Sequence, residues 1–567
     1  MDNLRLILFF ALAFILMMLW QAWDKDYGAK PQSTVTTETS TGQADTTSSV
    51  PSAIPASPAI GNNGTPSSVP EISSTAAVPM STTDTSRPAV PTITVKTDLY
   101  TMEIGTVGGN VLKVFLNDYP ASLGDKENSF QLMKPEVPEL FVAQSGLIAG
   151  EGSTAPSHET PYQAGSNSYE LTDGADQLSV DLHWTSPEGV TVTKRYTYQR
   201  GSYLVTVQHI LQNGSGKPWV GREYRQLMRT PPENNSAASK LLYTYTGGAI
   251  YSEENKYEKI SFEDMEESKL SREVKGGWIA MLQHYFLGAW IPPEDQTDTF
   301  YTNVLPGKRY VLGAYTPAVT VGQGANHTFS SGFVASPKLQ DELKAISKGL
   351  DLSVDYGWLT VIAQPIFWLL KQIQGVVVNW GLSIILLTLL IKALFYKLSE
   401  ASYKSMANMR RMTPRIQALK DRFGEDKTRL NAAMMELYKK EKINPLGGCL
   451  PILVQIPVFI SLYWVLLESV ELRQAPFIFW IQDLSIKDPY FVLPLIMGVS
   501  MFIQQKLNPA PPDPMQAKIM MALPVVFTVF FAFFPAGLVL YWVTNNVLSI
   551  AQQWYITRQI ENAAAKA

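Results

Sequence analysis

The sequence predicts a multi-domain membrane protein with an N-terminal anchor helix, an all-β domain outside the membrane and a C-terminal bundle of five spanning helices. Three observations lead to this fold class. Long apolar runs crowd the first 20 residues and the last third of the 567-residue chain. The region between them holds many short alternating segments without intervening helices, which is typical of an antiparallel sandwich. The single cysteine, Cys449, excludes an intrachain disulfide, so the β domain must depend on its hydrophobic core.

Residues 1–25 are predicted to form an uncleaved anchor with its N-terminus inside the cell. The apolar run from Leu4 to Trp20 ends in bulky side chains, whereas signal-peptide cleavage requires small ones. A cleaved signal peptide is the alternative. Residues 26–91 consist mainly of Ser, Thr, Pro and Ala and carry few large apolar side chains. Such a segment cannot offset its own ordering entropy, so it predicts a disordered tether.

Residues 92–340 are predicted to fold as a β-sandwich. Apolar and polar residues alternate in the segments 190–198, 203–207 and 278–282, and Gly and Asn turns separate such segments. All the histidines of the chain fall in this domain without the spacing of a metal site, namely His158, His183, His209, His284 and His327. We interpret them as ordinary strand and loop residues.

Residues 341–374 are predicted to form a connector followed by an amphipathic helix. Five large apolar residues fall on one side of that helix: Trp358, Ile362, Ile366, Leu369 and Ile373. A helix of this kind suits the surface of a membrane just before the first span. A core helix packed on the sandwich is the alternative.

Residues 375–556 are predicted to contain five spans, at about 376–396, 450–467, 490–505, 517–534 and 536–553. The last two are separated by Pro535 and Gly537, which indicate a tight turn. The stretch 397–448 carries twelve Lys or Arg against six Asp or Glu, so we expect a cytoplasmic helical hairpin that turns at Gly424. Both termini, including the short tail 557–567, are then cytoplasmic, and the β domain lies outside.

The first of these spans contains one charged residue, Lys392. Thr388 lies one turn before the lysine and Tyr396 one turn after it, so a continuous helix places all three on one face. A lysine in mid-membrane costs roughly 2.5–3.5 kcal/mol, which makes it a functional candidate. Lys392 is also close to the end of the span, and the alternative is that its side chain reaches the membrane surface.

The composition of the C-terminal region excludes several chemistries. No histidine follows Leu350, and the five later spans contain no Asp or Glu inside them. Intramembrane metalloproteases, aspartyl proteases and proton relays need those groups, and no nucleotide-binding motif is present. We therefore expect no enzyme, no cofactor and no metal, and the net charge of −4 gives no sign of nucleic-acid recognition. The uncharged polar residues and Lys392 could line a wet cleft, open to the cytoplasm, that binds a hydrophilic segment of another chain.

Several motifs in this region resemble the signature of the YidC/Oxa/Alb membrane insertases, in the Gram-negative form with a large periplasmic domain. They are Asn444–Cys449, Pro451–Pro457, Ser469–Phe477, Asp513–Gln516 and Phe534–Tyr541. The resemblance covers 355–556. It implies a periplasmic β-supersandwich and an insertase core with a cytoplasm-facing hydrophilic groove. It also implies a protein of the bacterial inner membrane that inserts and helps to fold transmembrane segments, alone or with the Sec translocon.

The resemblance places the positive charge of the groove on Lys392. Bacterial members typically have arginine there, and lysine keeps the charge but lacks the planar fork of the guanidinium. We expect the substrate groove to consist of Lys392, Thr388, Gln455, Tyr541 and Trp542.

The cytoplasmic hairpin is expected to recruit the nascent membrane protein, the ribosome or a targeting factor. Its basic residues are Arg410, Arg411, Arg415, Lys420, Arg422 and Lys427. The tail after Trp554 has only Arg558 and Lys566 as basic residues, so ribosome contact would depend on the hairpin.

Two other classes of function remain open at this point. One is a channel or transporter with Lys392 in its pore. The other is a membrane-anchored periplasmic protein that binds sugar or peptidoglycan through its sandwich.

Overall fold

The computed structural model describes residues 91–150, 153–232, 244–424, 426–441, 450–508 and 514–566. The expected anchor at 1–25, nearly all of the expected tether at 26–91 and the motif around Cys449 lie outside the described residues. The chain divides into two compact units. One comprises Met1–Ser67 with Met412–Ile443, and the other comprises Ser68–Arg411 with Asn444–Ala567.

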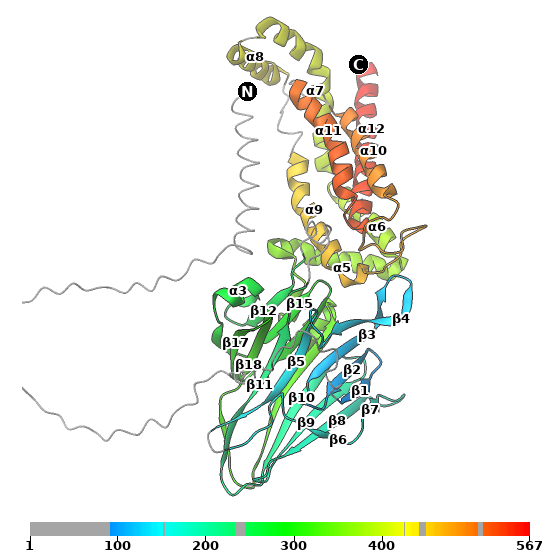
Figure 1. Cartoon of the computed structure of the whole chain (residues 1–567). Helices are drawn as coiled ribbons and strands as arrows, with labels where there is room; N and C mark the ends of the chain where they lie inside the picture. The colour runs from blue at the N-terminus through cyan, green and yellow to red at the C-terminus, as the bar shows by residue number, and fades with distance from the viewer. Residues whose placement is uncertain are drawn as a thin grey trace, which may run out of the picture. The chain divides into compact units, whose positions relative to one another are not determined.

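The N-terminal part of the second unit is an all-β domain of two large sheets (Figure 1). The 11-stranded sheet has the order β14-β17-β18-β11-β5-β3-β2-β1-β7, with β4 on β3 and β19 on β11. Its strands are β1 Thr92–Lys96, β2 Tyr100–Gly105, β3 Val111–Ser122, β4 Asp125–Met133, β5 Phe141–Ala149, β7 Ser168–Glu170, β11 Trp219–Arg229, β14 Ser271–Lys275, β17 Thr297–Leu305, β18 Arg309–Tyr315 and β19 Val319–Val321.

The 9-stranded sheet has the order β13-β12-β15-β16-β20-β10-β9-β8-β6. Its strands are β6 Gln163–Ala164, β8 Gln177–Thr185, β9 Val190–Gln199, β10 Leu204–Asn213, β12 Gly247–Ser252, β13 Lys256–Ile260, β15 Trp278–Gln283, β16 Phe286–Ile291 and β20 Asn326–Pro337. The alternating segments of the sequence fall in β9, β10 and β15, and burial in β9 alternates residue by residue. The expected all-β domain is confirmed. A short helix that the sequence analysis did not predict, α3 (Phe262–Glu267), begins at a capping box formed by Ser261 and Asp264.

The core of the β domain is large and aromatic. Trp278 and Trp290 are fully buried in it, and each contributes more than the roughly 1.5–3 kcal/mol of a buried aliphatic side chain. The ring of Tyr251 stacks on Trp278 at 5.9 Å between ring centroids. A core of this size lets the domain hold together without a disulfide, as the sequence requires.

The same domain buries a network of charged side chains. Arg225 Nη1 lies 2.5 Å from Glu223 Oε2, and Arg225 Nη2 pairs with Asp298. His209 Nδ1 lies 2.8 Å from the other oxygen of Glu223. Burial would raise the pKa of the Glu223 carboxyl, but Arg225 and His209 outweigh burial and hold that pKa below its ordinary value. The network pairs opposite charges and is buried, and two of its nitrogen atoms, Arg225 Nε and His209 Nε2, have no hydrogen-bond partner among the described residues.

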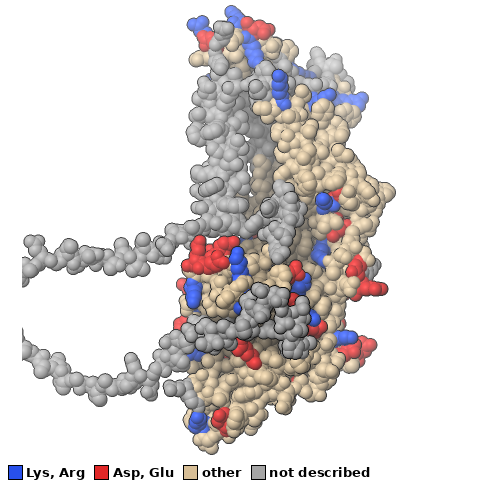
Figure 2. All heavy atoms as spheres, viewed as in Figure 1, with Lys and Arg blue, Asp and Glu red and all other residues tan. Residues whose placement is uncertain are grey.

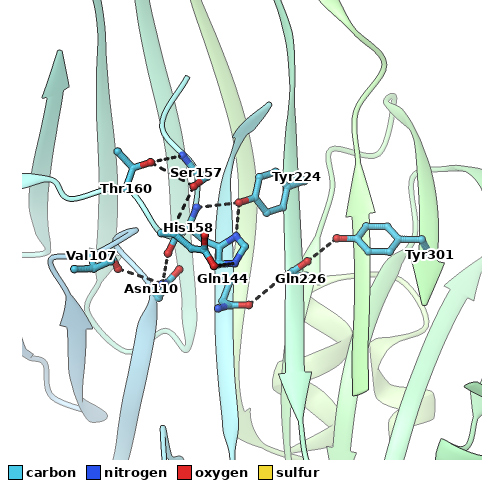
Figure 3. A network of polar contacts seen from close by, with 10 residues as sticks. Val107, Asn110, Gln144, Ser157, His158, Thr160, Tyr224, Gln226 and Tyr301 are labelled. Atoms are coloured by element: carbon cyan, nitrogen blue, oxygen red, sulfur yellow. Dashed lines mark hydrogen bonds and ion pairs between the residues drawn. The ribbon is translucent and has the colours of Figure 1, made fainter. Parts of the chain in front are cut away.

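A second buried polar network fastens the loop at His158 to the strands (Figure 3). The hydroxyl of Tyr224 accepts a hydrogen bond from the His158 amide at 2.9 Å, and the Asn110 side-chain amide donates to the His158 carbonyl at 2.8 Å. Two residues after Tyr224 on β11, Gln226 bridges two side chains, since it donates to Gln144 of β5 and accepts from the Tyr301 hydroxyl of β17. These hydrogen bonds connect neighbouring residues of the fold, so we interpret the network as structural.

The C-terminal part of the chain is helical. Its helices are α4 Gln340–Ile346, α5 Thr360–Val377, α6 Trp380–Leu394, α7 Tyr396–Phe423, α8 Lys427–Lys440, α9 Leu450–Glu468, α10 Val492–Leu507, α11 Pro514–Phe531 and α12 Ala536–Lys566. Helix α12 packs against α6, α9 and α10, and α11 packs against α10. Leu387, Leu462, Met497 and Val539 lie in one buried cluster between these helices.

Helix α6 starts later and ends earlier than the expected span at 376–396. Val378 adopts a left-handed conformation with φ of 53°, and the Asn379 side chain caps α6 by accepting from the Leu382 amide. At the other end, Trp380–Leu394 and Tyr396–Met409 meet at a bend of 68°. Tyr396 therefore opens the next helix and does not continue the face that holds Lys392.

Helix α5 has the amphipathic character that the sequence predicts. Phe367 and Leu370 are buried against the neighbouring helices α6 and α9, whereas Val361, Trp368 and Val376 are strongly exposed. In Figure 1 the helix runs across α9. Exposed tryptophan and valine on one side suit a helix that lies in a membrane surface.

Several polar contacts join the β domain to the helical region within the second unit. His284 Nε2 donates to the Leu467 carbonyl at 2.8 Å, and Arg473 Nη2 donates to the Pro120 carbonyl at 2.8 Å. Lys338 lies 3.8 Å from Glu468 and is almost fully buried. The end of α9 is thereby held against the β domain.

Among the described residues, no single helix is both long and apolar enough to cross a membrane. The bent pair Trp380–Leu394 and Tyr396–Met409 meets that test together, and Val454–Glu468, Val492–Leu507 and Ala517–Phe531 are shorter apolar helices. Figure 2 shows few charged side chains over α10, α11 and α12 on the face drawn, whereas they are frequent over the β domain.

Candidate functional site

A cavity of about 270 Å³ opens among helices α6, α7, α9, α10 and α12. Its lining is Lys392, Ser399, Ser402, Tyr403, Met406, Gln455, Ile456, Phe459, Gln504, Asn508, Tyr541, Trp542, Asn545 and Ser549. Four of the five residues expected in the groove, Lys392, Gln455, Tyr541 and Trp542, therefore line one cavity.

Lys392 is the sole charged side chain among the described residues that line this cavity. It is half-buried, and its Nζ donates a hydrogen bond to Ser549 Oγ at 2.8 Å. The Ser549 hydroxyl in turn donates to the Asn545 carbonyl, one turn earlier on α12, at 2.7 Å. The lysine thus has a neutral partner and faces no carboxylate within the lining. Two of its three N–H groups have no hydrogen-bond partner among the described residues.

Other lining residues combine amides with aromatic rings. Gln455 Nε2 of α9 donates to Asn545 Oδ1 of α12 at 2.7 Å. Phe459, one turn further along α9, stacks on Tyr541 at 5.7 Å between ring centroids and meets Trp542 edge-on at 4.4 Å. Amide groups can exchange hydrogen bonds with a polar chain, and the rings give the cavity a firm apolar floor.

Thr388, the fifth residue expected in the groove, does not line the cavity. It is almost fully buried, and its hydroxyl donates to the Ile384 carbonyl of its own helix at 2.6 Å. Ser461, Thr528 and Thr544 bond back to their own helices in the same way. Hydroxyls that bond back to their own helix in this way are already satisfied and offer little to a ligand.

The first turns of α7 also line the cavity, which we did not predict from the sequence. Ser399, Ser402, Tyr403 and Met406 line the cavity, although we assigned this stretch to the cytoplasmic hairpin. Their spacing places them on one helix face, a signal that was present in the sequence. Ser549 had no such signal, because it lies 157 residues from Lys392 in the chain.

The basic residues expected to recruit partners lie on α7 and α8. Arg411 donates to the Ile560 carbonyl at 3.1 Å, and Arg415 forms an ion pair with Glu441 at 2.6 Å. The guanidinium of Arg422 lies 5.3 Å from the centre of the Phe423 ring. Lys420 also has an interaction partner. The side chains of Arg410 and Lys427 lie outside the described residues.

The described residues contain no cluster of His, Cys, Asp and Glu suited to a metal ion. The cavity has hydrogen-bonding groups and one cation next to apolar rings. Such a combination is chemically suited to carboxylate or carbonyl oxygens of a polar segment.

Comparisons with known proteins agree on one family. The family described as "YidC periplasmic domain" matches residues 92–369, and that described as "60Kd inner membrane protein" matches residues 372–563. The chain is 51% identical to the "Membrane protein insertase YidC" of Methylococcus capsulatus, with all of both chains covered. It is also 51% identical to the protein of that name from Thioalkalivibrio sulfidiphilus, again over the whole of both chains.

Among solved structures, the chain is similar to "Active YidC insertase crystal structure with the first transmembrane domain resolved". The match covers 82% of this chain and 92% of that one, at 18% identity and a TM-score of 0.36. The structural similarity is weak at that TM-score, and the family assignment depends on the sequences.

Proposed function

The chain belongs to the YidC family of membrane protein insertases, and we propose that the cavity around Lys392 takes up the polar part of each substrate. The insertase function is shared by its full-length relatives, so the proposal concerns how this chain performs it. One observation carries the proposal. Lys392, Gln455, Tyr541 and Trp542 come from three helices and line the same cavity.

The proposed topology follows from charge and apolar surface. Helices α9, α10, α11 and α12, together with α6 and the start of α7, cross the inner membrane. The hairpin of α7 and α8 lies in the cytoplasm, and the β domain lies in the periplasm. The positive excess of 397–448 supports this orientation. The N-terminal anchor at 1–25 adds a sixth span and places both termini in the cytoplasm.

The cavity lowers the energetic cost of moving a polar segment into the membrane. Amide groups and water replace part of the hydration that the segment loses, and the Lys392 ammonium attracts its carboxylates and carbonyl oxygens. Ser549 is a neutral partner at 2.8 Å, so the ammonium can exchange this bond for one to a substrate without exposing a buried carboxylate.

The apolar segment of the substrate needs a different surface. Val525, Val526 and Val529 of α11 are strongly exposed, and Val454 of α9 is exposed as well. We infer that these side chains guide the segment along α9 and α11 while its polar tail occupies the cavity. Transfer of about 20 apolar residues into lipid then drives release without nucleotide.

Other partners of the insertase belong to the same proposal. Nascent membrane proteins and the lipid bilayer follow from the insertase function itself. The Sec translocon, the ribosome and targeting factors are proposed partners, with the basic hairpin of α7 and α8 as their contact. Arg415 is paired with Glu441, and we expect the exposed cations of this hairpin to provide most of the attraction.

The central experiment replaces Lys392 in a depletion strain and measures insertion of a short phage-coat-type substrate. Lys392→Glu should reduce insertion most, because it repels substrate carboxylates. Lys392→Ala should reduce it about tenfold, which corresponds to about 1.4 kcal/mol. Lys392→Arg should retain it.

The matched control is Lys397→Ala and Lys397→Glu, since the side chain of Lys397 is 92% exposed on the next helix and pairs with Glu400. Both control variants should insert the substrate normally. If the Lys392 variants with alanine and glutamate also insert it normally, the cavity does not take up substrate through its charge.

Photo-crosslinking places the substrate directly. A crosslinker at position 392 or 541 should capture the polar tail of a stalled nascent chain. The same crosslinker at position 394, where Leu394 is 74% exposed, serves as the control. Equal capture at all three positions would contradict a specific route through the cavity.

A further inference from the structure

A second groove lies on the surface of the helical region, between α10 and α12. Its volume is about 760 Å³, and it shares no lining residue with the cavity around Lys392. Val499 and Ile503 form its side on α10, and Val547 and Trp554 form its side on α12. All four are exposed by about half. The groove is therefore an open apolar surface that something in the membrane must cover.

The polar atoms near this groove are already satisfied. Ser500, the one polar side chain in the described lining, accepts from Asn546 Nδ2 at 3.0 Å and donates to the Met497 carbonyl at 2.7 Å. An occupant of the groove consequently meets hydrocarbon alone along most of its length.

One end of the groove differs from the rest because it carries positive charge. Gln553 of α12 donates to the Leu507 carbonyl at 3.3 Å, which holds the end of α10 against α12. Lys506 precedes this residue and lies 4.8 Å above the Phe502 ring. On the other side of the same end, Arg558 lies 5.2 Å above the ring of Trp554. Neither cation has an ion-pair partner within the described part of the chain.

We propose that this groove binds an anionic phospholipid, with an acyl chain between α10 and α12 and the phosphate at Lys506 and Arg558. The apolar surface would accept any acyl chain, but two cations at one end favour a negative headgroup. Trp554 beside them is the residue type that prefers the level of the headgroups.

The shape of the groove disfavours a protein helix as its occupant. Helices that associate in membranes use small residues, which allow the backbones to approach closely. The sides of this groove are instead made by Leu495, Val499, Ile503 and Val547. The inference rests on the proposed function, because it requires that the helical region is embedded with this end at the cytoplasmic leaflet.

The test uses the full-length chain in bilayer discs of phosphatidylcholine that contain a minor fraction of brominated lipid. Bromine quenches nearby tryptophan, and the signal of Trp554 is the difference between the wild type and Trp554→Phe. Brominated phosphatidylglycerol should quench this signal at a lower mole fraction than brominated phosphatidylcholine. The double variant Lys506→Gln/Arg558→Gln should lose the preference, by about fivefold for each cation.

Two matched variants control for charge and for bulk. Lys439→Gln/Lys440→Gln, on α8, removes the same net charge and should keep the preference. Val499→Trp fills the groove and should weaken quenching by phosphatidylglycerol, whereas Val529→Trp, exposed on α11, should not.

Three results would overturn the proposal. Equal quenching by both lipids would indicate only ordinary surrounding lipid. Quenching by neither lipid at Trp554, with other tryptophans quenched, would indicate that a protein segment covers the groove. A double variant that keeps the preference would exclude the two cations. If no tryptophan of the helical region is quenched by either lipid, the proposed embedding itself is wrong, which separates that failure from failure of the lipid site.

Discussion

Arg225 of the β domain and Lys392 of the helical region are two cations removed from bulk water in different ways. In the β domain Arg225 is fully buried and pairs with Glu223 and Asp298. In the helical region Lys392 is half-buried, and the Ser549 hydroxyl is its one hydrogen-bond partner among the described residues.

A buried charge without an opposite charge costs stability, and Arg225 is paired with two carboxylates. The fully buried Lys194 of the same domain instead donates to the Gly108 and Ser145 carbonyls, at 2.9 Å each. The helical region keeps Lys392 in a cavity beside a neutral hydroxyl, which is the arrangement that our proposal for substrate binding uses.

The largest expected effect concerns the paired cation. Arg225→Met leaves two carboxylates buried without their partner, so the free energy of unfolding of the β domain should fall by about 3–5 kcal/mol. Pulse proteolysis of the purified full-length chain in urea measures this change.

The control in the same domain is Arg195→Met. Arg195 binds both oxygens of Asp181 at 2.7 Å, but both side chains are about one third exposed. Removing this ion pair should lower the free energy of unfolding by less than about 1 kcal/mol. Equal losses for the two variants would mean that burial does not distinguish the pairs.

A pH effect is expected at the contact between the two regions. Burial lowers the pKa of His284 to about 4. The positive charge of Lys338 also lowers this pKa, whereas the hydrogen bond to the Leu467 carbonyl raises it. The unfolded chain has a histidine pKa of about 6.5. Above pH 6.5 neither state binds the proton and the stabilisation is complete. As pH falls towards 4, the unfolded state gains the proton first and stability falls.

The titration of His284 should lower the free energy of unfolding by about 2 kcal/mol when the pH falls from 7.5 to 5.0. His284→Gln can still donate to the Leu467 carbonyl but cannot titrate, so its unfolding free energy should change less over that interval. Thermal unfolding of both proteins at the two pH values gives the difference, in which the titration of shared carboxylates cancels. An identical pH dependence for both would exclude His284 as the source.

The smallest change in stability is expected at Lys392 of the helical region. Lys392→Met should leave the stability of the helical region unchanged within about 1 kcal/mol, because the side chain has no charged partner to strand. Circular dichroism during denaturation in detergent measures this stability. A loss as large as that of Arg225→Met would mean that Lys392 is structural.

Local patterns in the sequence predicted the β domain well, because alternation along a strand reflects burial at each residue. The segment 190–198 lies within β9, and 278–282 lies within β15. The buried network around Arg225 had no local signal, since β11 reads as a polar strand and Asp298 is 73 residues away. Pairing over that distance depends on the tertiary fold.

The candidate site was predicted in part for the same reason. Lys392 is conspicuous in an apolar run, and Gln455 and Tyr541 are polar residues in apolar helices. Thr388 lies one helical turn before Lys392, which made it a candidate, but its hydroxyl donates to a carbonyl of its own helix α6. The break at Val378 also escaped prediction, because an Asn cap inside an apolar stretch is a weak signal beside the long hydrophobic run.

The most direct test of the account asks whether Lys392 is reachable by water from the cytoplasm. Cys449 is the chain's one cysteine, so Lys392→Cys in a Cys449→Ser background carries a single thiol. A charged, membrane-impermeant thiol reagent is added to inverted inner-membrane vesicles and, separately, to intact spheroplasts. Lys397→Cys, at a strongly exposed position, gives the reference rate.

We predict that position 392 reacts in inverted vesicles within about tenfold of the reference rate and does not react in spheroplasts. A thiol at position 392 that stays unreacted in inverted vesicles, or that reacts from the outside, would contradict a hydrated cavity open to the cytoplasm.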